Sequence, residues 1–201
     1  MSLRGNQSYA RMARDCYFTP EAGIRPLLRH LPVEMMRRHQ VWECAAGDGF
    51  LAMHLARAGL SVTALDVAPV AQQYFPVAQG DFLEQRFEGA RRPLSFITNP
   101  PYGEASRLII AFLHHAMAHA GVTRGLVAML LPFEFDTRAS RDALVGGHPC
   151  FAAKITCGER LRWRNLPPKD IEPKAHHSWF IWAFEPALRA AIRAQGAMRV
   201  A

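Results

Sequence analysis

Short apolar runs alternate with stretches of helical periodicity along this sequence, and most of the runs end at a proline, a glycine or an acidic residue. Such runs are typical of buried strands in a parallel sheet, and the stretches between them are typical of helices that cover it. Strands are expected at residues 41–43, 61–66, 77–78, 94–98, 125–133, 152–156 and 179–184, and helices at 20–30, 50–56, 106–118, 138–144 and from 186. The pattern therefore predicts an α/β fold.

The composition is that of one globular domain, residues 1–201. A length of 201 residues suits a single domain, and half of the residues are hydrophobic, which is enough for a core. No apolar run approaches the roughly 18 residues needed to span a bilayer, and residues 1–14 contain no signal-peptide-like apolar stretch. The four cysteines show no C-x-x-C spacing, which favours reduced thiols. We therefore expect a cytoplasmic protein without a membrane partner.

The net charge of +7 is unevenly distributed. Residues 1–40 carry 7 basic and 3 acidic residues, residues 41–150 carry 8 and 10, and residues 151–201 carry 9 and 4. Basic flanks around a slightly acidic middle suggest a polyanion held by the flanks, which favours a nucleic acid partner. Composition bias is the alternative, because 21 of the 24 basic residues are arginine.

The string Asn99-Pro100-Pro101-Tyr102 follows the expected strand at 94–98. Neither proline can donate to a sheet ladder, so the strand ends there. The Asn99 side chain and the Pro100 carbonyl are then left at the carboxyl end of a strand, where open α/β sheets bind ligands. Tyr102 adds a flat aromatic face two residues on. A strand followed by a purely structural proline turn is the alternative.

A strand, a small-residue turn and a helix occur in order around Gly47 and Gly49, which is the cofactor-binding arrangement of a doubly wound fold. Asp66 ends the next strand, 19 residues after Gly47. That spacing suits a carboxylate that accepts bonds from ribose hydroxyls, with a capping aspartate as the alternative. The turn is not the G-x-G-x-x-G fingerprint and no P-loop lysine follows, so nucleoside triphosphate binding is not expected.

The string from Asn99 to Tyr102 resembles the catalytic motif of S-adenosylmethionine (SAM)-dependent amino-group methyltransferases, in particular small, phage- or prophage-type adenine-N6 DNA methyltransferases. The turn from Glu43 to Gly49 resembles their motif that begins with an acidic residue and ends in G-x-G, with two small substitutions. Thr19 is expected to cap the first helix, with Pro20 as its first residue. This aromatic-Thr-Pro entry resembles the N-terminal motif of the family, although an ordinary helix start is the alternative.

The resemblance implies a Rossmann-like class I methyltransferase fold, with helices on both faces of a mostly parallel seven-stranded sheet, and SAM as the cofactor. It implies direct methyl transfer to the N6 amino group of adenine in DNA. Asn99, Pro100, Pro101 and Tyr102 are then the catalytic string, in which Asn99 and Pro100 hold the amino group and Tyr102 stacks on the extruded base. The cofactor-binding residues that it implies are Thr19, Pro20, Glu43, Ala45, Gly47, Gly49, Asp66, Asp81, Phe82 and Asn99.

The segment 158–178 is basic, aromatic and interrupted by prolines, which predicts a long substrate-side loop. Arg160, Arg162 and Arg164 are expected to contact phosphates, and Trp163 either stacks on a base or fills a core position. Two histidines four residues apart lie in the expected helix 106–118 and just beyond it, but no third ligand is evident, so no metal site is expected.

Two alternatives to DNA methylation remain. The first is methylation of RNA adenine or of protein glutamine, although the glutamine enzymes usually carry a larger helical domain ahead of the cofactor turn, and only about 40 residues precede it here. The second is a non-catalytic SAM- or nucleic-acid-binding module, against which the intact Asn99 string argues. No separate target-recognition domain is evident, so sequence specificity is low, resides in segment 158–178 or comes from a partner chain. The oligomeric state is left open.

Overall fold

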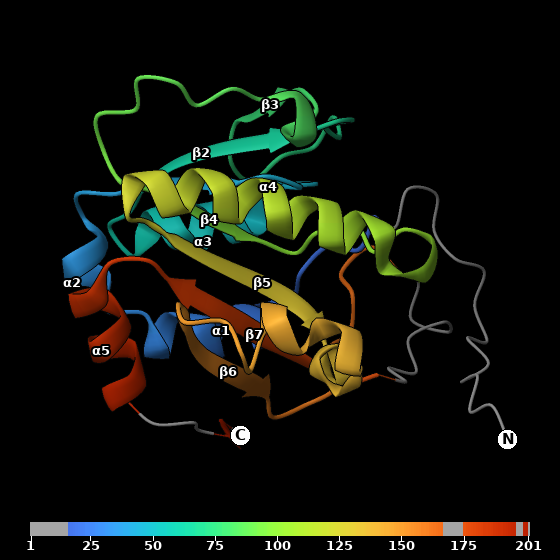
Figure 1. The fold of residues 1–201 in the computed structure, drawn as a ribbon. Helices are drawn as coiled ribbons and strands as arrows, with labels where there is room; N and C mark the ends of the chain where they lie inside the picture. Colours follow the sequence, from blue (N-terminus) through green and yellow to red (C-terminus); the bar gives the residue numbers. More distant parts are fainter. Residues whose placement is uncertain (1–15, 167–174, 196–198, 201) are drawn as a thin grey trace, which may run out of the picture.

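The computed structural model describes residues 16–166, 175–195 and 199–200 (Figure 1). Its centre is one sheet with the strand order β3-β2-β1-β4-β5-β7-β6-β8. The strands are β1 Gln40–Glu43, β2 Ser61–Asp66, β3 Val77–Gln79, β4 Leu94–Thr98, β5 Leu126–Pro132, β6 Phe151–Cys157, β7 His177–Ala183 and β8 Arg199–Val200. The first five strands run parallel, and β7 is antiparallel to both of its neighbours. The predicted mostly parallel α/β sheet is therefore confirmed.

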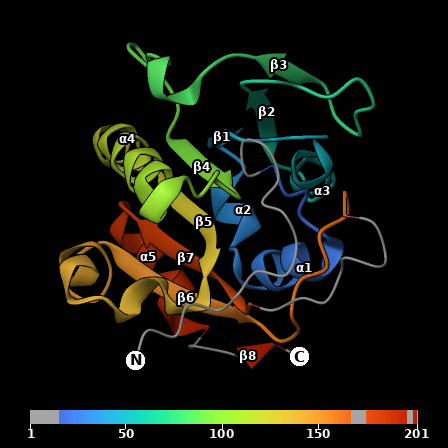
Figure 2. The same cartoon turned by 90° about the vertical axis from the view of Figure 1, so that its right-hand side faces the viewer.

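Helices cover both faces of the sheet (Figure 2). The α-helices are α1 Glu21–His30, α2 Val33–Met36, α3 Phe50–Arg57, α4 Arg107–Thr123 and α5 Pro186–Ala194. Short 3-10 helices are η2 Phe82–Glu84, η3 Glu104–Ser106, η4 Phe133–Thr137 and η5 Ala139–Leu144. Figure 2 places α4 on one side of the strands and α1 and α3 on the other.

The central strand β5 explains why the sheet needs helices on both faces. Successive side chains of a strand point to opposite faces, and here all of them from Leu126 to Leu131 are fully buried. The even-numbered ones pack in the core with α1, α3 and α5, and the odd-numbered ones pack with α4. An uninterrupted apolar strand is stable in water only when both of its faces are covered.

Two expectations from the sequence need correction. Thr19 does not cap α1: the helix begins at Glu21 with Pro20 as the N-cap residue, and no side chain caps it. The buried Thr19 side chain instead packs toward Gly23. The short helix expected at 138–144 is present as the 3-10 helix η5, Ala139–Leu144. The sheet gains an eighth strand, β8, which pairs with β6 outside the seven that were expected. The expected lead-in at residues 1–15 lies outside the described residues.

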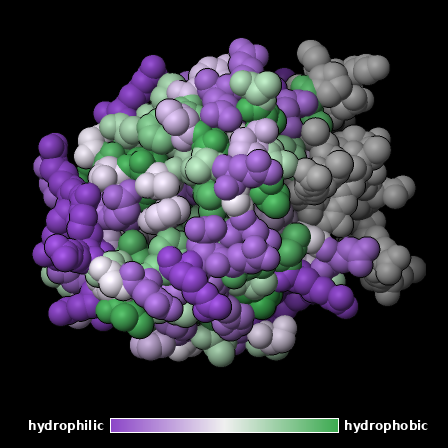
Figure 3. Space-filling model, turned by 90° about the horizontal axis from the view of Figure 1, so that it is seen from above, coloured by the Kyte–Doolittle hydropathy of each residue, from purple (hydrophilic) through white to green (hydrophobic). Residues whose placement is uncertain are grey.

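The surface seen from above mixes hydrophilic and hydrophobic residues, with hydrophilic residues gathered along the left edge of the view (Figure 3). Over the described ranges, each helix is too short or too polar to cross a bilayer.

Candidate active site

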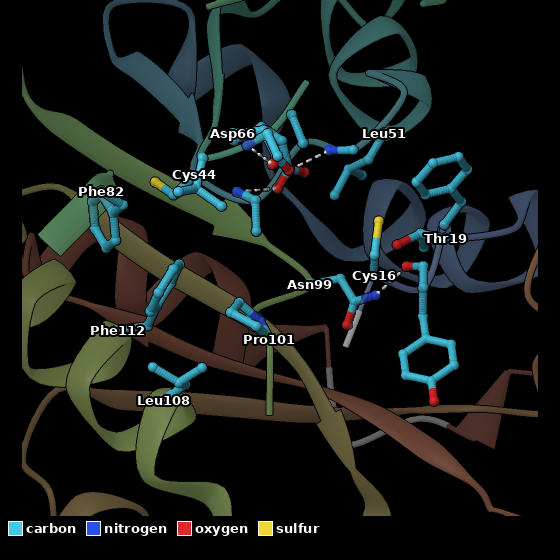
Figure 4. Close-up of a pocket in the computed structure, with 18 of the residues that line it drawn as sticks. Cys16, Thr19, Cys44, Leu51, Asp66, Phe82, Asn99, Pro101, Leu108 and Phe112 are labelled. Atoms are coloured by element: carbon cyan, nitrogen blue, oxygen red, sulfur yellow. Dashed lines mark hydrogen bonds between the residues drawn. The ribbon is translucent and has the colours of Figure 1, made fainter. Parts of the chain in front are cut away.

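A cavity of about 570 Å³ opens at the carboxyl ends of β1, β2 and β4 (Figure 4). Because β1 lies between β2 and β4, the strand order reverses here, which is where open α/β sheets bind ligands. The segment before α1 and the beginning of α4 complete the walls. The cavity brings together most of the predicted cofactor-binding residues: Thr19, Glu43, Ala45, Gly47, Asp66, Asp81, Phe82 and Asn99. Pro20 and Gly49 lie next to lining residues in the sequence but do not line the cavity themselves.

The glycine turn after β1 is held to the end of β2 by Asp66. Gly47 has φ +55°, a conformation that favours glycine, and a Cβ atom there would lie 2.8 Å from the Phe18 ring. The Gly47 amide donates to Asp66 Oδ2 at 2.8 Å, and the Ala68 amide donates to Asp66 Oδ1 at 2.8 Å. Asp66 therefore caps the loop backbone and also presents its carboxylate to the cavity, because each carboxylate oxygen can accept a second bond.

Glu43, the last residue of β1, is a buried acid in the wall of the cavity. Its Oε1 accepts bonds from Thr98 Oγ1 at 2.5 Å and from the Ala45 amide at 3.4 Å, whereas Oε2 has no hydrogen-bond partner among the described residues. Burial, with a smaller contribution from the charge of Asp66, raises the pKa of the Glu43 carboxyl to about 8, although the hydrogen bonds from Thr98 and Ala45 lower it. The group is therefore mostly protonated at neutral pH.

Asn99 follows β4 directly, and its two amide ends have different environments (Figure 4). Its Nδ2 donates to the carbonyl oxygen of Tyr17 at 3.0 Å. Its Oδ1 is buried and has no hydrogen-bond partner within the described ranges. Because the donor end is held, the acceptor end is left for another group. Pro101 also lines the cavity, whereas Pro100 is buried and does not.

Tyr102 lies next to the cavity rather than in its wall. Its ring stacks on the ring of His177, with centroids 6.3 Å apart and an angle of 28° between the planes. His177 begins β7 and is 5% exposed, and burial lowers its pKa to about 4. A neutral imidazole therefore supports the tyrosine ring.

Phe82 and Asp81 form the side of the cavity under α4. Phe82 is 1% exposed and packs against Phe96 and Phe112 with ring centroids 5.5 and 5.0 Å apart. The Asp81 side chain accepts a bond from the Leu83 amide at 2.8 Å, which caps η2. Both residues line the cavity, which is compatible with the predicted contact to a cofactor. That contact stays a prediction.

Some residues of the predicted substrate-side loop are exposed, whereas others are buried or ion-paired. Arg162 is exposed, and the exposed Arg160 contacts the ring of His176 at 3.3 Å. Trp163 is 7% exposed and its ring lies 5.5 Å from that of Tyr17, so the structure favours the core position for it. Residues 167–174 of this loop lie outside the described residues.

Arg164 forms an ion pair with Asp48 of the glycine turn. Its Nη1 donates to Asp48 Oδ2 at 2.7 Å, and its guanidinium lies over the rings of Phe50 and Tyr74 at 3.8 and 4.7 Å. The side chain of Asp48 also accepts a bond from the Phe50 amide at 3.2 Å. The charge of Arg164 is thus already paired, and its predicted phosphate contact has no geometric support.

Sequence reasoning missed the residues that join distant segments at the cavity. Cys16, Tyr17 and Phe18 line it, and Asn165 bonds to the backbone of this segment. The only signal in the sequence was the aromatic pair ahead of Thr19. In the part of the chain that the structure describes, no group of three or more His, Cys, Asp and Glu residues could hold a metal ion.

No protein-family model and no curated protein matches this sequence. Solved structures match its fold. A protein from Listeria monocytogenes assigned as a class I SAM-dependent methyltransferase is 14% identical, with a TM-score of 0.60, over 91% of this chain and 65% of that one. The methyltransferase subunit of a type I restriction-modification system from Streptococcus thermophilus is 15% identical, with a TM-score of 0.54, over 84% of this chain and 45% of that one.

A third match is 1,6-didemethyltoxoflavin-N1-methyltransferase from Burkholderia thailandensis, solved with 1,6-didemethyltoxoflavin and S-adenosylhomocysteine bound. It is 14% identical, with a TM-score of 0.56, over 82% of this chain and 79% of that one. The present chain covers less than two thirds of the first two matched chains, at 65% and 45% of their lengths. At such identities a match speaks for the fold. The strand order, the helices on both faces and these matches together show that the chain has a Rossmann-like class I methyltransferase fold.

Proposed function

We propose that this protein is a SAM-dependent methyltransferase that methylates the N6 amino group of adenine in DNA. The observation that carries the proposal is the orientation of Asn99. Its amide nitrogen is held by the Tyr17 carbonyl. Its buried oxygen, at the carboxyl end of β4, is an acceptor without a partner among the described residues. A site built in this way selects a donor such as an amino group.

The cavity suits SAM as the methyl donor. Its volume of about 570 Å³ lies within the range of cofactor sites. Asp66 offers carboxylate oxygens to ribose hydroxyls, Asp81 and Phe82 line the cavity and are proposed to contact the adenine ring, and the unpartnered Oε2 of Glu43 is a buried polar atom left for a ligand. The structure of the Burkholderia thailandensis enzyme, with S-adenosylhomocysteine bound, supports the same choice.

The residues of the string then act by orientation and hydrogen bonding. An exocyclic amino nitrogen is a weak nucleophile because its lone pair is delocalised into the ring. Asn99 Oδ1 and the Pro100 carbonyl oxygen accept its two hydrogens and favour a tetrahedral nitrogen with an available lone pair. When bound, SAM supplies the electrophilic methyl group for direct transfer. Tyr102, supported by His177, stacks on the base that has left the duplex. No covalent enzyme intermediate is needed.

The choice of DNA rests on charge and on one structural match. The basic flanks surround a slightly acidic catalytic middle, and the exposed Arg160 and Arg162 belong to the loop that leads into β7 beside Tyr102. The matched Streptococcus thermophilus protein is a restriction-modification methyltransferase subunit. Both observations favour a polynucleotide over a small molecule.

The test is transfer of a tritium-labelled methyl group from SAM. The protein is incubated separately with DNA, RNA and total cell protein, and modified nucleosides are identified by mass spectrometry after digestion. We expect label in DNA as N6-methyladenine, and none with an Asn99→Ala preparation that controls for contaminating enzymes. Label mainly in RNA or in protein would replace the substrate, and no transfer to any of the three would contradict the proposed activity.

A further inference from the structure

The wall of the cavity that holds Asn99 is a short extended segment before α1, residues Cys16 to Thr19, which has no helix or strand of its own. Such a segment keeps its place only if other parts of the chain bind its backbone. The part of the chain that binds it is the end of the segment 158–166, where Asn165 lies 147 positions after Phe18. Asn165 and the backbone of Arg164 make these bonds.

Three hydrogen bonds fix Phe18 and its neighbours from the outer side. Asn165 Oδ1 accepts from the Phe18 amide at 3.0 Å, and Asn165 Nδ2 donates to the Cys16 carbonyl at 2.7 Å. The Arg164 amide donates to the Phe18 carbonyl at 3.1 Å. The Asn165 side chain therefore bridges two backbone groups of the segment, in the way that a neighbouring strand would.

On the inner side the same segment holds Asn99, and it does so through the same peptide unit. The amide of Phe18, which donates to Asn165, and the carbonyl of Tyr17, which accepts from Asn99 Nδ2, belong to one peptide bond. A peptide unit is planar, and none of the described peptide bonds is cis, so its N–H and C=O point to opposite sides. The two asparagines therefore bond to opposite sides of one planar peptide unit, Asn165 to its N–H and Asn99 to its C=O.

We infer that Asn165 is a positioning residue for Asn99, acting through the Tyr17–Phe18 peptide. This inference rests on the proposed function for its catalytic meaning. The chain Asn165 Oδ1···H–N–C=O···H–Nδ2 Asn99 fixes the tilt of the peptide and so the direction of the Tyr17 carbonyl. That carbonyl holds the donor end of the Asn99 amide, which fixes the orientation of Oδ1, the acceptor without a partner among the described residues. Linked hydrogen bonds of this kind also polarise one another.

The hydrogen-bonded chain from Asn165 through the Tyr17–Phe18 peptide to Asn99 (the relay) can be tested apart from the rest of the segment Cys16 to Thr19 (the wall segment). The wall segment has two roles, which are to support the cofactor end of the cavity and to orient Asn99. Phe18 packs on Gly47, so loss of the whole wall would weaken cofactor binding. A tilt of the peptide alone would leave the wall in place and misdirect Asn99. Misplacement of a reacting group by about 1 Å can cost on the order of 100-fold in rate. Asn165 is therefore expected to affect turnover at saturating SAM and DNA more than SAM affinity.

The kinetic test compares Asn165→Ala with Asn165→Asp and with Glu159→Ala, an exposed residue of the same segment, as the matched control. Aspartate keeps an acceptor for the Phe18 amide and loses the donor to Cys16, so it should retain kcat within about threefold. Alanine should lower kcat by about 10- to 100-fold, and Glu159→Ala should leave it unchanged. Equal losses with alanine and aspartate, or no loss with either, would overturn the inference. Calorimetric SAM binding shows that each variant is folded.

A double-mutant cycle tests whether the effect passes through Asn99. In an Asn99→Ala background, Asn165→Ala should change the residual rate by less than about twofold, because residues in one network are not additive. A full additional loss in that background would show that Asn165 acts by another route and would contradict the relay.

A spectroscopic arm does not depend on the proposed activity. The chain contains three asparagines, Asn6, Asn99 and Asn165, so selective ¹⁵N-asparagine labelling gives three side-chain amide signals. The Asn99 pair is identified by its loss in Asn99→Ala. We expect it to shift and to exchange faster with solvent in Asn165→Ala and to remain near its wild-type position in Asn165→Asp. An Asn99 signal that Asn165→Ala leaves unchanged would refute the relay even if methyl transfer were never observed, whereas a shift without methyl transfer would refute only the proposed function.

Discussion

The two halves of the cavity are built in different ways. In the half proposed to bind the cofactor (the cofactor half), Glu43 and the glycine turn lie within a few residues of each other, and the turn is tied to Asp66 over 19 positions. In the half proposed to carry catalysis (the catalytic half), Asn99 is held by Tyr17 over 82 positions, and the segment containing Tyr17 is held by Asn165 over 147 positions. Neighbouring loops supply most of the first half, where Arg164 adds one distant contact to Asp48 of the turn, whereas the second half depends on distant segments alone. Changes in the two halves should therefore have separable effects.

The largest separation is expected from Asn99→Ala. It removes one of the two acceptors that the proposed reaction uses for the amino group, so turnover should fall by about 100- to 1000-fold. SAM affinity, measured by calorimetry, should stay close to wild type because Asp66, Asp81 and Phe82, the residues proposed to hold the ribose and the adenine ring, are unchanged. Near-normal turnover would mean that the string from Asn99 to Tyr102 is structural.

Tyr102→Ala serves as the companion variant and should weaken the DNA complex by about 1–3 kcal/mol if the ring stacks on a base.

Asp66→Ala should have the opposite profile. Loss of charged acceptors for the ribose hydroxyls should weaken SAM binding by about 1.5–3 kcal/mol. The Gly47 and Ala68 amides also lose their acceptor, so a lower melting temperature is expected along with the weaker binding. Asp142→Ala, at an exposed position of η5, is the control in which neither quantity should change. Unchanged SAM affinity in Asp66→Ala would remove this residue from the cofactor site.

The cofactor half should lose stability as the pH rises. The pKa of Glu43 is about 8 in the folded protein and 4.5 without burial, so the folded state holds a proton that the unfolded state releases between these values. Wild-type stability therefore falls across this window, by at most about 1.4 kcal/mol per pH unit. Glu43→Gln should remove that slope. Urea unfolding of both proteins at pH 5, 6.5 and 8 measures it, and a difference that is constant with pH would contradict the assignment.

The catalytic half should show the opposite sign through His177. Its pKa is about 4 in the folded protein and 6.5 without burial, so the unfolded state binds the proton first. The stability contributed by the neutral ring is complete above pH 6.5 and is lost as the pH falls toward 4. His177→Phe should reduce the acid sensitivity of unfolding. His39, whose pKa burial also lowers to about 4, should account for the remainder, and an unchanged acid limb in His177→Phe would contradict this prediction.

The smallest effect is expected for the exposed arginines of the substrate-side loop. Arg160→Ala combined with Arg162→Ala should flatten the dependence of log K on log salt for DNA by roughly 2, without a change in SAM affinity. Arg164→Ala is the matched comparison: its charge is paired with Asp48, so the salt slope should hold while the glycine turn is loosened. A wild-type slope in the double variant would direct attention to the basic N-terminal segment.

Much of the fold could be predicted from the sequence because its signals are local. The apolar runs at 61–66 and 94–98 became β2 and β4 with the same bounds, and the glycine turn lies between a strand and a helix as expected. The errors concern positions where local signals compete. Thr19 is a strong capping residue by type, yet its side chain is buried against Gly23 and the helix begins one residue later than that capping role requires. The short β8 carries no periodicity from which it could be found.

The sequence by itself determined that Gly47, Asp66 and Asn99 lie together at the cavity, because each stands at or shortly after the end of a strand and the carboxyl ends of parallel strands meet at one edge. Only the tertiary structure decided how these residues are held. The partner of Asn99 is a backbone carbonyl, and the partner of that peptide is Asn165, neither of which leaves a pattern in the sequence. It also decided that Arg164 pairs with Asp48 while Arg162 stays exposed, although the two look alike in the sequence. The physical reason is that a backbone hydrogen bond or an ion pair depends on where distant segments meet, and residue type alone does not encode that position.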